Sequence, residues 1–266
     1  MKSFTSNSSS IAYHRFFAAC IALVLAMGLQ QVQAQPLLEF EAGVGYVTRN
    51  SIQVPGDAPE ATYFDANEAL STNPIGAYRT RAGFRIAGRH NIFVLAAPLT
   101  ARYTGSFSED VRFKDNTYEA GTPVELDYTF NSYRLTYRYD VWGNQHWKVG
   151  VGLTGKIRDA ALALRDENGG QWARTTDFGF VPLVNLHVGY SAIEDWWLTL
   201  NGDGLVNPFS PSVGRAFDYR LAVRWEFADN AQAFAGYRFI EGGADVDQVY
   251  NFAWINYGVV GLSYGF

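Results

Sequence analysis

A strict alternation of apolar and polar residues recurs along this chain, and it is clearest between Ala216 and Phe227. Successive side chains of a β-strand point to opposite faces, so this pattern predicts a strand with one apolar and one charged face. In a soluble β-sandwich the charged face would meet water, whereas in a transmembrane barrel it would line the lumen and the apolar face would meet lipid. The apolar face would carry Phe217, Tyr219, Leu221, Val223, Trp225 and Phe227, and the other face would carry Asp218, Arg220, Ala222, Arg224 and Glu226.

The lengths of the connections between such runs separate these two folds. The connections GRHN (Gly88–Asn91), GNQH (Gly143–His146), SAIED (Ser191–Asp195) and ADNA (Ala228–Ala231) are tight, and they alternate with longer ones at 50–74, 106–122, 165–175, 206–215 and 242–249. Tight turns at one end and long loops at the other are typical of a transmembrane barrel, and a sandwich has no reason to alternate so regularly. We therefore predict an all-β fold, a transmembrane up-and-down antiparallel barrel of about ten strands, with eight or twelve as the alternatives. The predicted strands are 37–49, 75–87, 92–105, 123–141, 147–164, 176–190, 195–205, 216–227, 232–241 and 250–266.

Aromatic residues cluster near both ends of these runs. Aromatic side chains prefer the two membrane–water interfaces, where they form girdles around a barrel, whereas a sandwich core would place them at strand centres. Their positions therefore favour the barrel. Near the tight turns they are Trp142, Trp147, Tyr190, Trp196, Trp225 and Phe227, and near the long loops they are Tyr46, Tyr78, Tyr103, Tyr128, Phe217, Phe239 and Trp254.

The first 34 residues differ from the rest of the chain. Lys2 and Arg15 are their only charged residues, and an apolar run from Phe16 to Leu29 leads to small residues before Ala34. This order predicts a secretory signal peptide that is cleaved after Ala34, so that residues 35–266 form the barrel. A lipoprotein signal at Cys20 is the alternative.

Charge and composition argue against several classes of protein. The net charge is −5 and no basic cluster is present, which does not favour a nucleic-acid-binding protein. After the signal peptide, no segment approaches about 18 consecutive apolar residues, so no transmembrane helix is predicted. Removal of residues 1–34 would also remove the only cysteine, and with it any disulfide or thiolate metal site. We expect a monomer with no metal and no cofactor.

The closing stretch VYNFAWINYGVVGLSYGF carries a resemblance to a known family. It resembles the last strand of bacterial outer-membrane β-barrel proteins, which ends on a terminal Phe preceded by aromatic or apolar residues at alternating positions. The matching residues here are Val260, Leu262, Tyr264 and Phe266. The resemblance implies that this strand is the signal read by the barrel-assembly machinery, and that the protein lies in the outer membrane, surrounded by lipid and lipopolysaccharide. Asn256 departs from the pattern and suggests a bulge or a rim position.

Charged residues at inward-facing parities predict a polar lumen. One interpretation is a filled lumen in which Arg–carboxylate pairs stabilise the wall, and the other is a narrow water-filled pore that prefers anions. We favour the filled lumen. The inward parity changes between Asn131 and Ser132, which predicts a β-bulge there. Further expected inward acids are Glu39, Glu41, Glu125, Asp127, Asp140 and Asp203. The predicted charge network comprises Arg79, Arg81, Arg85, Arg102, Arg134, Arg138, Lys156, Arg158, Asp218, Arg220, Arg224, Glu226 and Arg238.

Three classes of function fit such a barrel. The leading expectation is a non-enzymatic, porin-like protein of the cell envelope that serves envelope integrity or limited small-solute passage. The second is a surface-binding or adhesion protein that acts through its long loops, since loops are where binding residues concentrate. The third is an outer-membrane protease or lipid-modifying enzyme. The omptin proteases share the expected strand count, but His90, His146 and His187 all lie outside the predicted long loops, where such an enzyme needs its general base.

Overall fold

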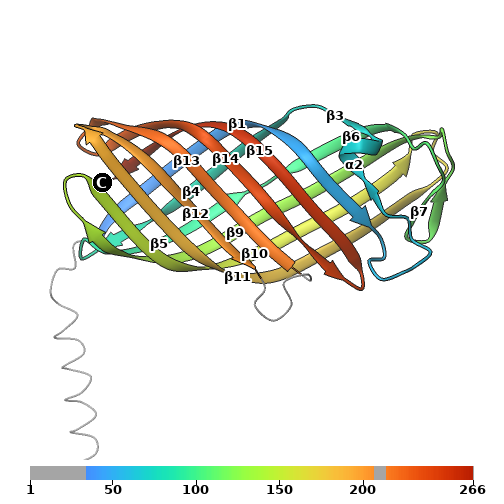
Figure 1. Ribbon diagram of the computed structural model, residues 1–266, viewed down its shortest axis with the longest axis horizontal. Helices are drawn as coiled ribbons and strands as arrows, with labels where there is room; N and C mark the ends of the chain where they lie inside the picture. Colours follow the sequence, from blue (N-terminus) through green and yellow to red (C-terminus); the bar gives the residue numbers. More distant parts are fainter. Residues whose placement is uncertain (1–33, 207–213, 266) are drawn as a thin grey trace, which may run out of the picture.

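The computed structural model describes residues 34–206 and 214–265, and it is a single β-barrel (Figure 1). Of the predicted signal peptide, only Ala34 lies within the described residues. Phe266, the last residue of the predicted assembly signal, lies outside them. Among the described helices, none is long and apolar enough to cross a membrane.

The barrel has ten antiparallel strands, as the spacing of the alternating runs predicts. β5 and β6 act as one barrel strand, because both pair with β9 on either side of a break at Pro98 and Leu99. The last strand pairs with the first from Leu37↔Gly265 to Gln53↔Tyr250 and thereby closes the wall. In order around the wall, the strands are β1 (Ala34–Gln53), β4 (Ile75–Ile86), β5 (His90–Ala97) with β6 (Thr100–Ser106), β9 (Pro123–Gly143), β10 (Trp147–Asp166), β11 (Trp172–Ile193), β12 (Trp196–Val206), β13 (Gly214–Ala228), β14 (Ala231–Val246) and β15 (Val249–Gly265).

Two of the predicted long loops are wrong, because the strands continue through them as hairpins. β10 and β11 stay paired up to Arg165↔Trp172, and β14 and β15 up to Val246↔Val249. Backbone groups beyond the bilayer still need hydrogen-bond partners, and a longer hairpin supplies them. The turn after Asp166 suits this geometry, since Asp166 accepts from Asn168 N and Gly169 adopts a φ of +81°.

The predicted loops 50–74 and 106–122 fold over the same end of the barrel (right in Figure 1), whereas most of the predicted loop 206–215 lies outside the described residues. The first contains β2 (Phe64–Asp65), the short helix α2 (Ala66–Ala69) and β3 (Ser71–Thr72). The second contains the hairpin β7 (Val111–Phe113) and β8 (Asn116–Tyr118). We call this the loop end, and the opposite end, which holds the tight turns, the tight-turn end.

The loop segments enclose an apolar core in the half of the barrel near the loop end. It includes Ile52, Phe64, Phe113 and Leu126, all nearly inaccessible to solvent. Tyr103 also belongs to this core. Tyr128 is buried beside it, so neither tyrosine belongs to the predicted outer girdle. The barrel is therefore filled by apolar side chains at this end.

The outer surface between the two ends is apolar. Leu153 is 69% exposed and Phe178 is 74% exposed, and an apolar surface that encircles a closed barrel is a lipid-facing surface. At the tight-turn end, the rings of Trp142 and Trp147 stack with their centroids 6.4 Å apart and form part of the aromatic girdle. The girdle toward the loop end includes Tyr46, Tyr78, Phe217, Phe239 and Trp254.

Asn256 lies within this outer girdle. Its amide oxygen accepts from the indole N–H of Trp254 at 3.1 Å and from the hydroxyl of Tyr237, and its amide nitrogen donates to Thr48 Oγ1 at 3.2 Å. The β1–β15 register shifts between Val47 and Arg49, close to this residue. Its polar side chain is thus satisfied at the rim by its neighbours.

The predicted bulge between Asn131 and Ser132 is wrong. The β9–β10 register is unbroken there, and the even-numbered side chains of β9 face inward from Val124 to Asp140. What changes is the environment: inward positions become apolar where the loops fill the barrel, and outward positions become polar where β9 leaves the bilayer. Arg102, Glu125 and Asp127 consequently lie on the outer face, where Arg102 Nε donates to Asp127 Oδ1 at 2.8 Å. Arg102, Glu125 and Asp127 are not lumen residues.

Candidate functional site

A layer of buried ion pairs crosses the lumen about midway between the two ends. We call it the charged belt. Its members alternate with lipid-facing residues, so the strand period alone turns them inward. They are Glu39 and Glu41 on β1, Arg79 and Arg81 on β4, Arg134 on β9, Asp203 on β12, Asp218, Arg220 and Arg224 on β13, and Arg238 on β14.

Asp218 is the centre of one half of the charged belt. Arg238 binds it in a bidentate manner, from Nε to Oδ1 at 2.7 Å and from Nη2 to Oδ2 at 2.8 Å. Arg134 donates to the same carboxylate from β9, which is not a neighbour of β13 in the wall. Arg79 Nη1 lies 3.7 Å from Oδ1. This half of the belt therefore spans the lumen instead of following the wall.

Arg220 is the centre of the other half and is 1% exposed. Its Nη1 donates to Glu39 Oε1 at 3.1 Å and also to Glu41. Glu39 additionally accepts from Arg81 and Arg224, each at 2.9 Å. Burial penalises each charge, but shared arginine–carboxylate bonds offset that penalty.

Asp203 connects the belt to neutral groups that the sequence analysis missed. Its Oδ2 accepts from Arg134 Nη1 at 2.7 Å, and its Oδ1 accepts from Thr154 Oγ1 at 2.6 Å and from Asn185 Nδ2 at 2.8 Å. Thr154 and Asn185 face inward by strand parity, and that parity is the signal that could have found them.

A cavity lies on each side of the charged belt. The inner cavity, toward the tight-turn end, has a volume of about 300 Å³ and is lined by Glu39, Arg81 and Arg224 of the belt. The outer cavity, toward the loop end, has a volume of about 380 Å³ and is lined by Arg134, Asp203 and Asp218 of the belt. The two share none of their described lining residues, so the belt separates them.

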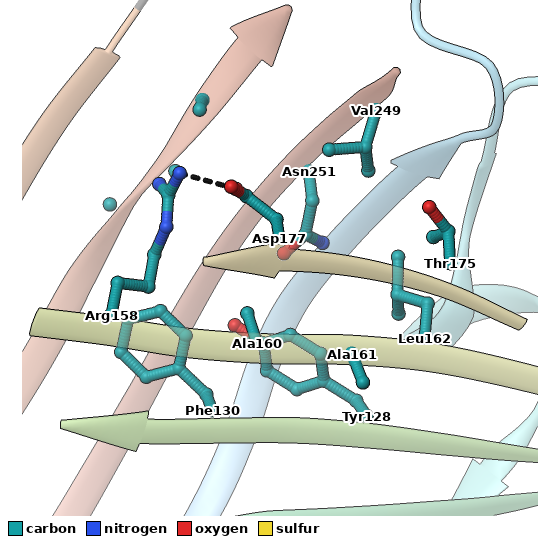
Figure 2. A pocket seen from close by; sticks show the side chains of 13 residues that line it. Tyr128, Phe130, Arg158, Ala160, Ala161, Leu162, Thr175, Asp177, Val249 and Asn251 are labelled. Carbon is teal, nitrogen blue, oxygen red and sulfur yellow. Dashed lines mark ion pairs between the residues drawn. The ribbon is translucent and has the colours of Figure 1, made fainter. Parts of the chain in front are cut away.

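The remaining predicted network residues line these cavities. Arg85, Arg138 and Glu226 line the inner cavity, where Arg138 Nε lies 3.2 Å from Asp140 Oδ1 and Lys148 Nζ lies 3.5 Å from Glu226 Oε1. Lys156 and Arg158 line the outer cavity. A recess of about 30 Å³ extends this cavity between β9, β10, β11 and β14, and there Arg158 pairs with Asp177 (Figure 2). The predicted network is thus three separate groups, and Arg102 belongs to none of them.

The histidines of the described chain do not form an acid–base site with a carboxylate. His187 lines the inner cavity and its Nδ1 lies 3.2 Å from Asn201 Nδ2. His90 contacts the hydroxyl of Tyr137, and His146 contacts the carbonyl of Ser191, both at the tight-turn end. Among residues 34–206 and 214–265, no cluster of three or more His, Cys, Asp or Glu side chains has the spacing of a metal site.

Comparisons with known proteins identify the fold. No family model matches the chain, and no curated protein matches its sequence. The outer-membrane protease OmpT of Escherichia coli superimposes with a TM-score of 0.54 at 11% identity, over 87% of this chain and 97% of that one. The translocator domain of the autotransporter NalP of Neisseria meningitidis gives 0.43 at 12% identity, over 96% and 97%. The attachment invasion locus protein Ail of Yersinia pestis, in complex with a heparin analogue, gives 0.37 at 9% identity, over 87% and 99%.

Proposed function

We propose that this ten-stranded outer-membrane β-barrel is a non-enzymatic envelope protein whose lumen is closed to ions and small solutes. The observation that carries the proposal is the charged belt, which joins opposite walls of the barrel through Asp218 and Arg220. A hydrated ion would have to break several charge-assisted bonds to pass between the two cavities, and such bonds are strong at low dielectric. The apolar core at the loop end adds a second barrier. Envelope integrity is therefore favoured over solute passage.

A non-enzymatic role is supported by the placement of the candidate general bases. A protease or lipid-modifying enzyme needs a base within hydrogen-bond reach of its substrate. His90 and His146 lie at the tight-turn end, and His187 lines the inner cavity, on the side of the charged belt that faces away from the loop end. The lengthened hairpins at the loop end keep a surface-binding role as the second candidate, since they project beyond the lipid-facing surface.

Ion conductance in planar lipid bilayers tests the closed lumen. We expect the wild-type protein to give no stepwise conductance, whereas replacement of Arg134 and Asp218 together by serine opens a path through the charged belt. The matched control replaces Arg102 and Asp127 by serine, which removes the same pair of charges from the outer face and should leave conductance absent. Stable, anion-selective steps in the wild type would overturn the proposal in favour of the water-filled pore.

A further inference from the structure

The outer cavity holds a buried cation that the charged belt does not use. Lys156 on β10 is 3% exposed and lines the cavity. Its Nζ lies 4.4 Å from the ring centroid of Phe130, and it forms an ion pair with none of the described carboxylates. A desolvated ammonium group without its own counter-ion is costly, and it marks a place where an anionic group would be stabilised.

The nearby carboxylates are already engaged by other donors. Asp203 accepts from Arg134, Thr154 and Asn185, and Asp218 is shared by Arg134 and Arg238. In the recess, Asp177 pairs with Arg158 (Figure 2), whose Nε is buried without a partner among the described residues. The cavity is therefore electropositive on its β10 side.

Apart from these paired charges and the pair of Arg215 with Glu241, most of the outer cavity lining is apolar. Apolar side chains of several strands line the cavity, and the volume of about 380 Å³ lies within the range of about 300–1,000 Å³ found for small-molecule sites. A cavity with one cationic group that lacks an ion pair and a mostly apolar remainder suits a molecule with an anionic head and an apolar tail. The apolar wall is formed by Phe130, Val181, Leu183, Leu205, Ile240 and Ile255.

Part of the cavity lining is also exposed on the lipid-facing surface. β11 pairs with β12 only from Val184 to Ile193, so its residues 172–183 have a strand partner on the β10 side alone among the described strands. Phe180 and Pro182 face outward along this free edge and yet line the cavity, as does Phe217 across from them on β13. The outer cavity is therefore lined in part by side chains that lipid also contacts.

We propose that the outer cavity binds a single-chain amphiphile with a carboxylate head. The carboxylate accepts a charge-assisted hydrogen bond from Lys156, and the alkyl chain lies along the apolar wall. This inference goes beyond the barrier role, because a closed lumen needs no ligand.

Equilibrium binding of radiolabelled dodecanoate tests the site. The protein is reconstituted in phosphatidylcholine vesicles, and partition into protein-free vesicles is subtracted. We expect saturable binding of dodecanoate, weaker binding of dodecanol, and none above background for dodecyltrimethylammonium. Lys156→Met should weaken dodecanoate binding by roughly tenfold to a hundredfold, which corresponds to one hydrogen bond to a charged group. Lys156→Arg should retain binding.

Two further variants separate the site from the fold. Lys148→Met removes a lysine from the inner cavity, and it should bind dodecanoate as the wild type does. Ala216→Phe fills part of the outer cavity and should reduce the binding of dodecanoate and dodecanol alike. Equal binding of dodecanoate and dodecanol by the wild type, or an unchanged affinity in Lys156→Met, would overturn the proposal. Conductance is measured separately, so failure of this site leaves the closed lumen to be judged on its own result.

Discussion

Replacement of Asp218 by asparagine tests whether the charged belt stabilises the barrel. Asp218 is 4% exposed and neutralises Arg238, Arg134 and, at 3.7 Å, Arg79. Arginines outnumber carboxylates in the belt, so loss of this carboxylate leaves Arg134 with Asp203 alone, and leaves Arg79 and Arg238 to share Glu41 with Arg220. Removal of one partner of a buried ion pair costs about 3–5 kcal/mol, and we expect Asp218→Asn to lower the free energy of unfolding by an amount in this range.

Arg220→Met should cost less, although Arg220 is the more deeply buried. Glu39 keeps Arg81 and Arg224 after this substitution, and Glu41 keeps Arg79 and Arg238. The loss is then close to that of hydrogen bonds to charged groups, about 1.5–3 kcal/mol. The order of the two effects follows from the arginine surplus.

Urea-induced unfolding in lipid vesicles, followed by tryptophan fluorescence, measures both changes. Asp127→Asn is the matched control, because its partner Arg102 is 59% exposed at the side chain and an exposed pair contributes about 0–1 kcal/mol. If Asp218→Asn cost no more than Asp127→Asn, or less than Arg220→Met, the argument from buried charge would fail.

Two other substitutions test the wall itself, each with a control on the same strand or surface. Gly261→Ala should impair barrel formation, because the new Cβ would lie 2.4 Å from the carbonyl oxygen of Phe40 and 2.2 Å from the Phe234 ring. Gly258→Ala is the control and should be neutral, because its Cβ would meet nothing within 4 Å. Equal folded yields of the two variants in vesicles would contradict this prediction. Leu153→Arg should lower stability by about 2–4 kcal/mol near the middle of the lipid-facing surface, whereas Ile193→Arg beside a tight turn should cost about 0–1 kcal/mol. A similar urea midpoint for both arginine variants would argue against a lipid-facing surface at Leu153.

The architecture was predictable because strand parity is a local property. Phe217 to Phe227 alternate with Asp218 to Glu226, and in a barrel this alternation places Arg220 and Arg224 inside. The tight turns predicted the strand order, since each one joins neighbours in an antiparallel sheet. Parity and turn spacing thus explain the number of strands and the inward position of most charged residues.

The partners of the charged residues were not predictable in the same way. Arg220 binds Glu39, which lies 181 residues away in the sequence and on another strand across the lumen. The alternation of residues along a strand does not predict which residues of distant strands pair. The alternation also placed Arg102 and Asp127 in the lumen, which is wrong. Within the bilayer the polar face of a strand points inward, whereas beyond the bilayer the outward face is polar too. The isolation of Lys156 depends on which donors already hold Asp203 and Asp218, and that follows only from the closed barrel.

The cross-lumen pairing in the charged belt has a consequence for the order in which the barrel forms. Arg134 on β9 and Asp218 on β13 cannot meet in an open sheet, since three strands stand between β9 and β13 in the wall. A partly assembled sheet would hold these charges apart, and the entropy of closing the long intervening segment must be met before their attraction contributes. Closure of the wall and pairing of the belt should therefore be a single late, cooperative event, with unclosed intermediates disfavoured in lipid because their charges are unpaired.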